Sequence, residues 1–547
     1  MTLRPFPPPP ATGRPGGRRG VLSHPAVDAL VIALLATAFL LSIAAAMPWH
    51  MDEFLGYHML ACHWYPGNMA NTFRGSCTRL GLAPFGDTLL PLRSYTYTGS
   101  LPGLLYLPVF ALWPSPLSAR LLGLIALAAQ AALLARVFGV RPAVSFGLLL
   151  AFLSYSALHV FDLGPVCLQT TLVFAVYALS RRWSEAVREG GRASWRYPAA
   201  AGLLVFVGIW NKVAFLFLLP SLALLAVVAM RGARSPEPAV GRRRVARDAL
   251  VGGVALAAPT AALLLARTAD GEAYYRVVTG SPVLLEASLA YRHFVDRLLP
   301  FLLNPLRTSH LIVVDRRPAT WLGVLTAALV VALLAYGLAA AWRRRDLAAR
   351  RGGALVAAWL LSLAMVAASR LSHAAHHVQL GLAFLILAAY EVLPAVARHR
   401  TVRALLLAFV AAQGVLYYQF AELRHEHTTA RASRDLPALN AELGDRFGRD
   451  HLIVCIDWGL YYFKSLYGPP EQAVVHHWRL VKSGQVERVA ATARRMGRRL
   501  AFVGLDAGGG SDWGLLEASV PDLVSERLPY DGGRWRVAYQ PAGGDRR

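Results

Sequence analysis

LVIALLATAFLLSIAAAMPWHMDEF, residues 30–54, decides the fold of this chain. Positions 30–47 carry no charged side chain, and an uninterrupted apolar segment of about 20 residues can cross a bilayer as a helix. The segment PWHMDEF (48–54) follows directly and holds two adjacent carboxylates, Asp52 and Glu53. An apolar helix that ends in acidic residues is typical of a span that meets water at the membrane boundary. The stretch therefore predicts an integral membrane protein.

Similar charge-free blocks recur along most of the chain. Hydrophobic residues make up 56% of it and charged residues only 16%, with a mean hydropathy of +0.42, whereas soluble domains carry about 25% charged residues. We expect a mainly α-helical, polytopic membrane bundle with about eleven spans. The spans are placed near residues 27–47, 119–137, 142–160, 165–181, 198–210, 213–230, 248–266, 319–341, 353–369, 375–396 and 401–420.

The arginines indicate which side of the membrane each loop occupies. The 56 basic and 32 acidic residues give a net charge of +24, and so basic a chain suggests nucleic acid or an anionic membrane as partner. The arginine clusters fall on every second loop between apolar blocks, which is the positive-inside pattern. They are Arg14, Arg18 and Arg19; Arg136 and Arg141; Arg181, Arg182 and Arg188; Arg242 to Arg244; Arg343 to Arg345; and Arg398, Arg400 and Arg403. The N-terminus and these loops are expected in the cytoplasm, and nucleic acid is not expected as a partner.

Three regions follow from this map. Residues 1–26, rich in Pro, Gly and Arg, indicate a disordered cytoplasmic N-terminus. Residues 27–420 are expected to form the membrane domain, with long outer loops at 48–118 and 267–318. Residues 421–547 return to a soluble composition and are expected on the outer, periplasmic face of a bacterial inner membrane.

The C-terminal region has the pattern of a small α/β domain. Short apolar runs at 451–458 and 499–506 predict buried strands. Between them, residues 484–498 have the periodicity of an amphipathic helix. Residues 534–540 (RWRVAYQ) predict an edge strand.

Two apolar stretches do not fit simple spans. Residues 101–113 are short and punctuated by proline, and they predict an interfacial helix. The stretch 198–230 is too long for one span and is interrupted by Asn211 and Lys212. We expect two helices that meet at a polar break on the outer face, because irregular backbone at that depth needs protein or a cavity around it.

Acidic residues on the predicted outer face are the first candidates for chemistry. Asp52 and Glu53 follow the first span, and Asp162 lies in the short loop FDLGP (161–165). Such carboxylates can serve as a general base or a cation site. The alternative is that Asp52, Glu53 and Asp162 are ordinary solvated acids at the ends of spans. A divalent metal is a candidate cofactor, with Asp52 and Asp162 as its candidate ligands; the sequence shows no other cofactor.

Basic residues on the same face are candidates for holding a phosphate. Lys212 lies at the predicted break, and Arg370, His373 and His377 lie in SRLSHAAHH (369–377). Guanidinium, ammonium and imidazolium groups bind phosphate through charge-assisted hydrogen bonds. His373 and His377 also have the i, i+4 spacing of metal ligands, but no HExxH glutamate accompanies them. The alternatives are a lysine that reaches to the interface and an ordinary basic turn.

The first outer loop holds further candidates. RSYTYTGSLPG (93–103) offers Arg93, Tyr95 and Tyr97 as residues that could contact an acceptor or a sugar, since sugars bind to aromatic faces and hydrogen-bonding groups. The tyrosines could equally be interface aromatics. Cys62 and Cys77 share this loop, and they are candidate disulfide partners because that side of a bacterial envelope is oxidising.

Together these features resemble the glycosyltransferase C superfamily, in particular its protein O-mannosyltransferase and lipid A aminoarabinose transferase branch. FDLGPVCLQ (161–169) is similar to the FDWGPVALQ stretch of bacterial members of that branch. The resemblance covers about residues 25–420. Its other elements are the acidic pair after the first span, Tyr97 to Ser100, the span opening SARLLG (118–123), Asp162, the break at Lys212 and the late His/Arg loop.

The resemblance implies a sugar transferase whose donor is a polyprenyl-phosphate sugar and whose acceptor is a lipid, glycan or protein. Asp52 would act at the acceptor as a base or orienting group, Glu53 would support it, and Asp162 would position the acceptor or a metal. Lys212, Arg370, His373 and His377 would hold the lipid phosphate, and the configuration would invert.

The chain departs from the aminoarabinose-transferase pattern at Leu163 to Pro165 and in its histidine-rich late loop, so substrate identity does not transfer. A transporter or flippase for a lipid-linked saccharide is the alternative function, and a non-catalytic scaffold is a third.

Overall fold

The structure is a computed structural model of the 547-residue chain. It describes residues 30, 32–34, 37–38, 49–50, 54, 57, 60, 82–85, 88–91, 93–95, 98–151, 167–191, 193–233, 238–265, 287–299, 320–343, 347–368, 376–396, 400–423, 432–433, 435–456, 458–469, 472–476, 486–506, 510–520 and 522–542.

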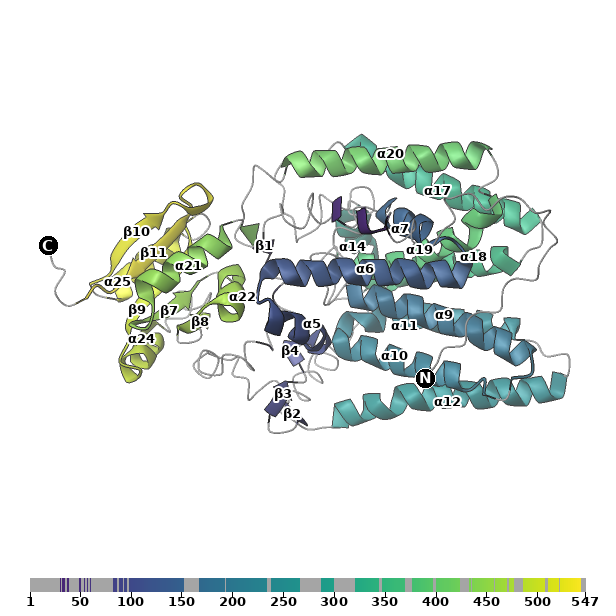
Figure 1. The fold of residues 1–547 in the computed structure, drawn as a ribbon, viewed down its shortest axis with the longest axis horizontal. Helices are drawn as coiled ribbons and strands as arrows, with labels where there is room; N and C mark the ends of the chain where they lie inside the picture. Colours follow the sequence, from purple (N-terminus) through teal and green to yellow (C-terminus); the bar gives the residue numbers. More distant parts are fainter. Residues whose placement is uncertain are drawn as a thin grey trace.

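A bundle of long helices forms one end of the molecule, and a mixed sheet with its own helices forms the other (Figure 1). The helices share a single hydrophobic core that draws on every layer of the bundle. Those of the bundle are α6 (Pro116–Phe138), α7 (Pro142–Ala151), α9 (Leu168–Arg188), α10 (Arg196–Asn211), α11 (Leu219–Gly232), α12 (Pro238–Leu265), α17 (Thr320–Arg343), α18 (Leu347–Ala368), α19 (His376–Val396) and α20 (Arg400–Leu423). The shorter α14 (Ala287–His293) lies beside α18, and η6 (Phe294–Leu298) follows α14.

Local sequence explains where these helices begin and end. In α6 the side chain of Ser115 caps the first turn by accepting from the Leu117 amide at 3.3 Å, and Pro116 supplies a φ already suited to a first helical residue. The helix ends at Gly139, whose φ of 67° is left-handed and therefore favours glycine.

Five helical segments within the described residues are long and apolar enough to cross a membrane. Together with the shared core they confirm a mainly helical membrane protein; the number of eleven spans remains a prediction. The segments are Pro116–Phe138, Ala214–Gly232, Arg242–Ala262, Gly323–Ala340 and Ala349–Ala368.

The sheet near the C-terminus has the order β10-β11-β9-β7-β8. Its strands are β7 (His451–Cys455), β8 (Ala473–His476), β9 (Arg499–Leu505), β10 (Val524–Leu528) and β11 (Trp535–Tyr539). β7 runs parallel to β8 and β9, whereas β11 is antiparallel to β9 and β10. The strands predicted at 451–458 and 499–506 correspond to β7 and β9, and the helix predicted at 484–498 is α24 (Val486–Arg495).

The strand predicted at 534–540 is present as β11, but its predicted position at the edge of the sheet was wrong. β11 lies inside the sheet, bonded on both sides, and β10 forms the edge. β10 has the sequence VSERL and is largely exposed. A search for short apolar runs therefore does not find it, because two of its five residues are charged. An exposed, charged strand is what a sheet edge favours, because it discourages pairing with other chains.

Helices cover both faces of this sheet. Alternate residues of each strand point to opposite faces. Leu452, Val454 and Phe502 pack with α24 and α25 (Gly510–Ser519). Ile453 and Val503 pack on the other face, with α21 (Leu436–Phe447) and α22 (Trp458–Tyr467).

The second of these faces joins the sheet to the membrane bundle. The same hydrophobic cluster continues through Phe54, Tyr57 and Leu60 of the first loop and through α5 (Leu101–Leu112). β1 (Trp49–His50) pairs antiparallel with β6 (Ala432–Ser433) at this junction. The cluster is thus continuous across residue 421, where the sequence placed a domain boundary. Short strands β2 (Leu82–Phe85), β3 (Thr88–Pro91), β4 (Arg93–Tyr95) and β5 (Thr98–Gly99) complete the described part of this loop.

Candidate functional site

The predicted site residues fall into two groups. Arg93 and Tyr95 lie in β4, His377 lies in the first turn of α19, and Lys212 follows α10. The others lie outside the described residues, so their roles and the proximity of Asp52 to Asp162 stay predictions. These are Asp52, Glu53, Cys62, Cys77, Tyr97, Asp162, Arg370 and His373.

The helix break predicted near Asn211 and Lys212 is confirmed. α10 ends at Asn211, Lys212 has an extended backbone with φ −156° and ψ 130°, and the 3₁₀ helix η5 (Val213–Leu218) begins directly after it. The Phe215 ring folds back onto Gly208, where a Cβ would lie 2.6 Å from it. Gly208 therefore lets the chain turn within a few residues.

Lys212 is buried at this break, with 5% of its surface exposed. A lysine that reaches toward the interface would expose its ammonium group, so that alternative does not describe Lys212. A buried cation interacts more strongly with an anion than a solvated one does, because the surrounding dielectric constant is lower. The burial of Lys212 favours an electrostatic role.

Gln169 connects α9 to the break. Its Nε2 donates to the Lys212 carbonyl at 3.3 Å, and its side chain is fully buried. Gln169 is the last residue of the segment FDLGPVCLQ, so the described end of that segment lies directly against the break.

The turn at Gly99 packs on the same place from the first loop. A Cβ on Gly99 would lie 2.5 Å from the Trp210 carbonyl oxygen and 3.2 Å from the Asn211 Cα. Only glycine permits so close an approach of two backbones. Three segments distant in the sequence, ending at Gly99, Gln169 and Lys212, therefore meet at one end of the bundle.

Buried polar atoms gather around this meeting point. Ser100 Oγ, Gln169 Oε1 and Thr170 Oγ1 are buried and have no hydrogen-bond partner among the residues that the structure describes. Buried polar groups are nearly always hydrogen-bonded, since leaving one unpaired costs about 1–3 kcal/mol. Their number here marks a polar environment suited to binding a ligand.

Arg120 is a charged residue that sequence reasoning did not select. It is 1% exposed in the first turns of α6, and its guanidinium carbon lies 3.7 Å above the centre of the Trp49 ring. This cation–π contact joins two motifs, because Trp49 belongs to PWHMDEF and Arg120 to SARLLG. The available signal was an arginine at the start of a largely apolar span whose other arginine, Arg136, lies in the last turn.

The C-terminal region contacts both flanks of the acidic pair. His50 pairs with Ala432 in the two-stranded β1–β6 ladder. Phe54 is fully buried and packs edge-on against Phe463 and Tyr467 of α22, with ring centres 5.2 and 5.9 Å apart. The segments that bracket Asp52 and Glu53 are therefore fixed by residues that lie between Ala432 and Tyr467, far later in the chain.

A metal centre receives no support from the part of the chain that is described. It contains no group of three His, Cys, Asp or Glu side chains that could hold an ion. Asp52 and Asp162, the candidate ligands, lie outside it. Cys167 and Cys455 are buried, and neither forms a disulfide with a described residue.

Comparisons with known proteins identify the architecture. No protein-family model matches the chain, and no curated protein matches it in sequence. The crystal structure of ArnT from Cupriavidus metallidurans bound to undecaprenyl phosphate is similar, with a TM-score of 0.56 and 14% identity, over 95% of this chain and 99% of that one. The chain therefore shares the overall fold of that structure. At this identity the likeness concerns the fold, and it extends through the sheet region as well as the bundle.

Proposed function

We propose that this chain is a membrane glycosyltransferase of the glycosyltransferase C type that takes its sugar from a polyprenyl-phosphate donor. The observation that carries the proposal is the likeness to ArnT along nearly the whole of both chains. That neighbour binds undecaprenyl phosphate, which belongs to the class of lipid phosphate that such a donor releases.

The geometry of the described residues supports this function. The Gly99 turn, the start of α9 and the Lys212 break converge, and a buried cation lies among buried polar atoms. A site for a lipid-linked sugar needs such a combination, because the phosphate requires a cation and the sugar requires hydrogen-bonding groups.

The proposed chemistry is one displacement at the anomeric carbon. Asp52 accepts a proton from the acceptor hydroxyl or amine, and Glu53 and Asp162 orient the groups around it. The nucleophile attacks from the face opposite the phosphate, so the configuration inverts as the bond from the anomeric carbon to the phosphate oxygen breaks. Lys212, together with Arg370, His373 and His377, stabilises the negative charge that develops on the departing phosphate.

The proposed location is the extracytoplasmic face of a bacterial inner membrane. The arginine map places the N-terminus inside and the sheet outside. The acceptor is a lipid, a glycan or a protein of the cell envelope, and Arg93, Tyr95 and Tyr97 are the proposed residues of its sugar-binding surface. The site described above lies at the same end of the bundle as the sheet (Figure 1).

The decisive experiment compares Asp52→Asn with wild type in a deletion strain. We expect at least a hundredfold loss of sugar transfer, the low end of the contribution of a general base, with unchanged membrane expression. The readout is mass spectrometry of envelope lipids and glycoproteins. Asp445→Asn, an exposed aspartate on α21, is the matched control and should transfer normally.

Two outcomes would overturn the proposal. Wild-type transfer by the Asp52→Asn variant would exclude its catalytic role. Movement of a labelled lipid-linked saccharide across vesicles containing the purified protein, with no covalent product, would establish the transporter alternative instead.

A further inference from the structure

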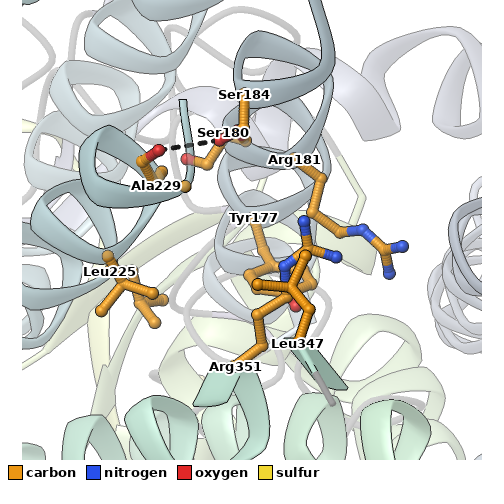
Figure 2. Close-up of a pocket in the computed structure, with 10 residues that line it drawn as sticks. Tyr177, Ser180, Arg181, Ser184, Leu225, Ala229, Leu347 and Arg351 are labelled. Carbon is orange, nitrogen blue, oxygen red and sulfur yellow. Dashed lines mark hydrogen bonds between the residues drawn. The ribbon is translucent and has the colours of Figure 1, made fainter. Parts of the chain in front are cut away.

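A pocket lined by two arginines and by apolar side chains lies between three helices of the bundle (Figure 2). The pocket has a volume of about 450 Å³, part of which is open solvent. Helices α9, α11 and α18 line it. Arg181 of α9 is twelve positions beyond Gln169, or about 18 Å along the helix. The pocket and the Lys212 break therefore belong to opposite ends of α9.

The pocket lies where apolar spans end. Gly232, the last residue of the candidate span Ala214–Gly232, lines it. Arg351, near the start of the candidate span Ala349–Ala368, lines it as well. In a bilayer this is the depth at which the hydrocarbon gives way to phosphate headgroups. By the arginine map this end faces the cytoplasm.

Two arginines from different helices line the pocket. Figure 2 shows Arg181 and Arg351 on the same side of the pocket, with Leu225 across from them. Both line the pocket together with Tyr177. Arg181 is paired with Glu391 at 3.2 Å, whereas Arg351 makes no hydrogen bond or ion pair with any described residue. Within the described part of the chain, one positive charge of the pocket thus has no carboxylate partner.

The remaining polar groups of the pocket have no hydrogen to donate to a ligand. Ser180 donates to the Val176 carbonyl at 2.9 Å, and Ser184 donates to the Ala229 carbonyl at 3.0 Å. The Tyr177 hydroxyl donates to Glu391. Only guanidinium N–H groups remain, so the pocket favours an anionic oxygen acceptor over a neutral sugar.

Apolar side chains form the rest of the lining. Leu225 and Val228 belong to α11, and Leu347 to α18. A small soluble anion would gain nothing from such a wall, whereas a lipid would place hydrocarbon along it. Basic pockets between membrane helices bind anionic lipid headgroups in this way.

We propose that this pocket binds the phosphate of an anionic glycerophospholipid, such as phosphatidylglycerol, from the leaflet opposite the transfer site. Arg351 supplies the principal contact, because no carboxylate of the described residues engages its guanidinium group. Arg181 adds N–H donors that its contact with Glu391 leaves available. This inference does not depend on the proposed transferase activity.

The test measures lipid binding to the purified, delipidated full-length protein. Native mass spectrometry would count phosphatidylglycerol and phosphatidylcholine retained by wild type, Arg351→Gln and Arg350→Gln. Arg350 is the matched control, being the adjacent, exposed arginine outside the pocket. We expect Arg351→Gln to lower phosphatidylglycerol affinity about fivefold, the effect of one arginine at a membrane surface, and Arg350→Gln to leave it unchanged.

Three results would overturn the proposal. Equal losses in the two variants would mean a diffuse surface charge without a site. Equal retention of phosphatidylcholine and phosphatidylglycerol by wild type would mean that the negative charge is not recognised. Displacement of phosphatidylglycerol by millimolar inorganic phosphate, which itself binds, would mean a site for soluble phosphate. An Arg351→Lys variant that keeps partial binding would confirm that folding is intact and that the guanidinium geometry matters.

Discussion

At the scale of single residues, the candidate site depends on small side chains as much as on charged ones. Gly99 lets the first loop touch the backbone of Trp210 and Asn211, and Gly208 makes room for the Phe215 ring. Neither glycine is itself reactive. Because both residues lack a Cβ, the Gly99 turn can pack directly against the break at Lys212.

Replacing Gly99 by alanine should therefore impair transfer. The new methyl group would meet the Trp210 carbonyl oxygen at 2.5 Å, and overpacking of this kind costs about 1–3 kcal/mol. We expect the backbones to separate, with transfer falling roughly tenfold, as about 1.4 kcal/mol of lost stabilisation implies. The measurement is initial rate together with melting temperature in detergent. Gly253→Ala, at an exposed helical position with open space, is the control and should retain both.

Lys464 predicts a pH dependence for the sheet region. It is fully buried in α22, its Nζ donates to Asn440 Oδ1 at 3.1 Å, and burial lowers its pKa to about 8. Between that value and the ordinary value of 10.5 the unfolded state binds more protons than the folded state, so the free energy of unfolding rises with pH across this window. The full effect is about 3 kcal/mol.

Lys464→Met should abolish that rise, because methionine fills a similar volume without a charge to desolvate. Pulse proteolysis of the C-terminal region in urea, at both ends of the window, measures the slope in each protein. A variant that keeps the wild-type slope would assign the pH dependence to another group. Asn440 would lose a donor in the variant, so the comparison concerns slopes and not absolute stability.

At the scale of elements, the sequence predicted what depends on local pattern. Charge-free blocks located the helices, and Asn211 with Lys212 located the break, because polar residues in an apolar stretch interrupt a span. The charged strand β10 was not predicted, since its position at the sheet edge follows from the pairing of distant strands. The contact of Arg120 with Trp49 was also not predicted, because the two residues are 71 positions apart and no local sequence pattern links them.

Helix α9 shows why hydropathy alone is insufficient. α9 contacts α6, α10, α11 and α19, yet it is not among the five helical segments that satisfy the length and hydropathy criteria for a span. Its Arg181 pairs with Glu391 of α19 inside the bundle. A helix surrounded by protein needs less apolar surface than one surrounded by lipid, so the partners of α9 account for its composition.

At the scale of the whole molecule, the sheet region and the membrane bundle act as one unit around the first loop. Residues from the first loop, α5, α21, α22 and the sheet share one hydrophobic cluster. The Tyr106 hydroxyl of α5 lies 2.7 Å from Ser118 Oγ of α6 and 3.3 Å from the Tyr467 hydroxyl. We infer that the C-terminal region holds PWHMDEF in place for transfer.

This inference predicts different effects for substitutions on the two faces of the sheet. Phe463 is 2% exposed and contacts Phe54 across the junction, whereas Phe502 is equally buried but packs with α24 and α25 on the opposite face. Phe463→Leu and Phe502→Leu should lower the stability of this region by similar amounts, about 1 kcal/mol. Only Phe463→Leu should lower transfer, and it should do so through the turnover number, because it loosens the segment that carries Asp52. Initial rates against acceptor concentration, beside pulse proteolysis, would distinguish the two. If both variants transferred equally well, the C-terminal region would have no part in holding the first loop, and its contacts with Phe54 and His50 would serve stability alone.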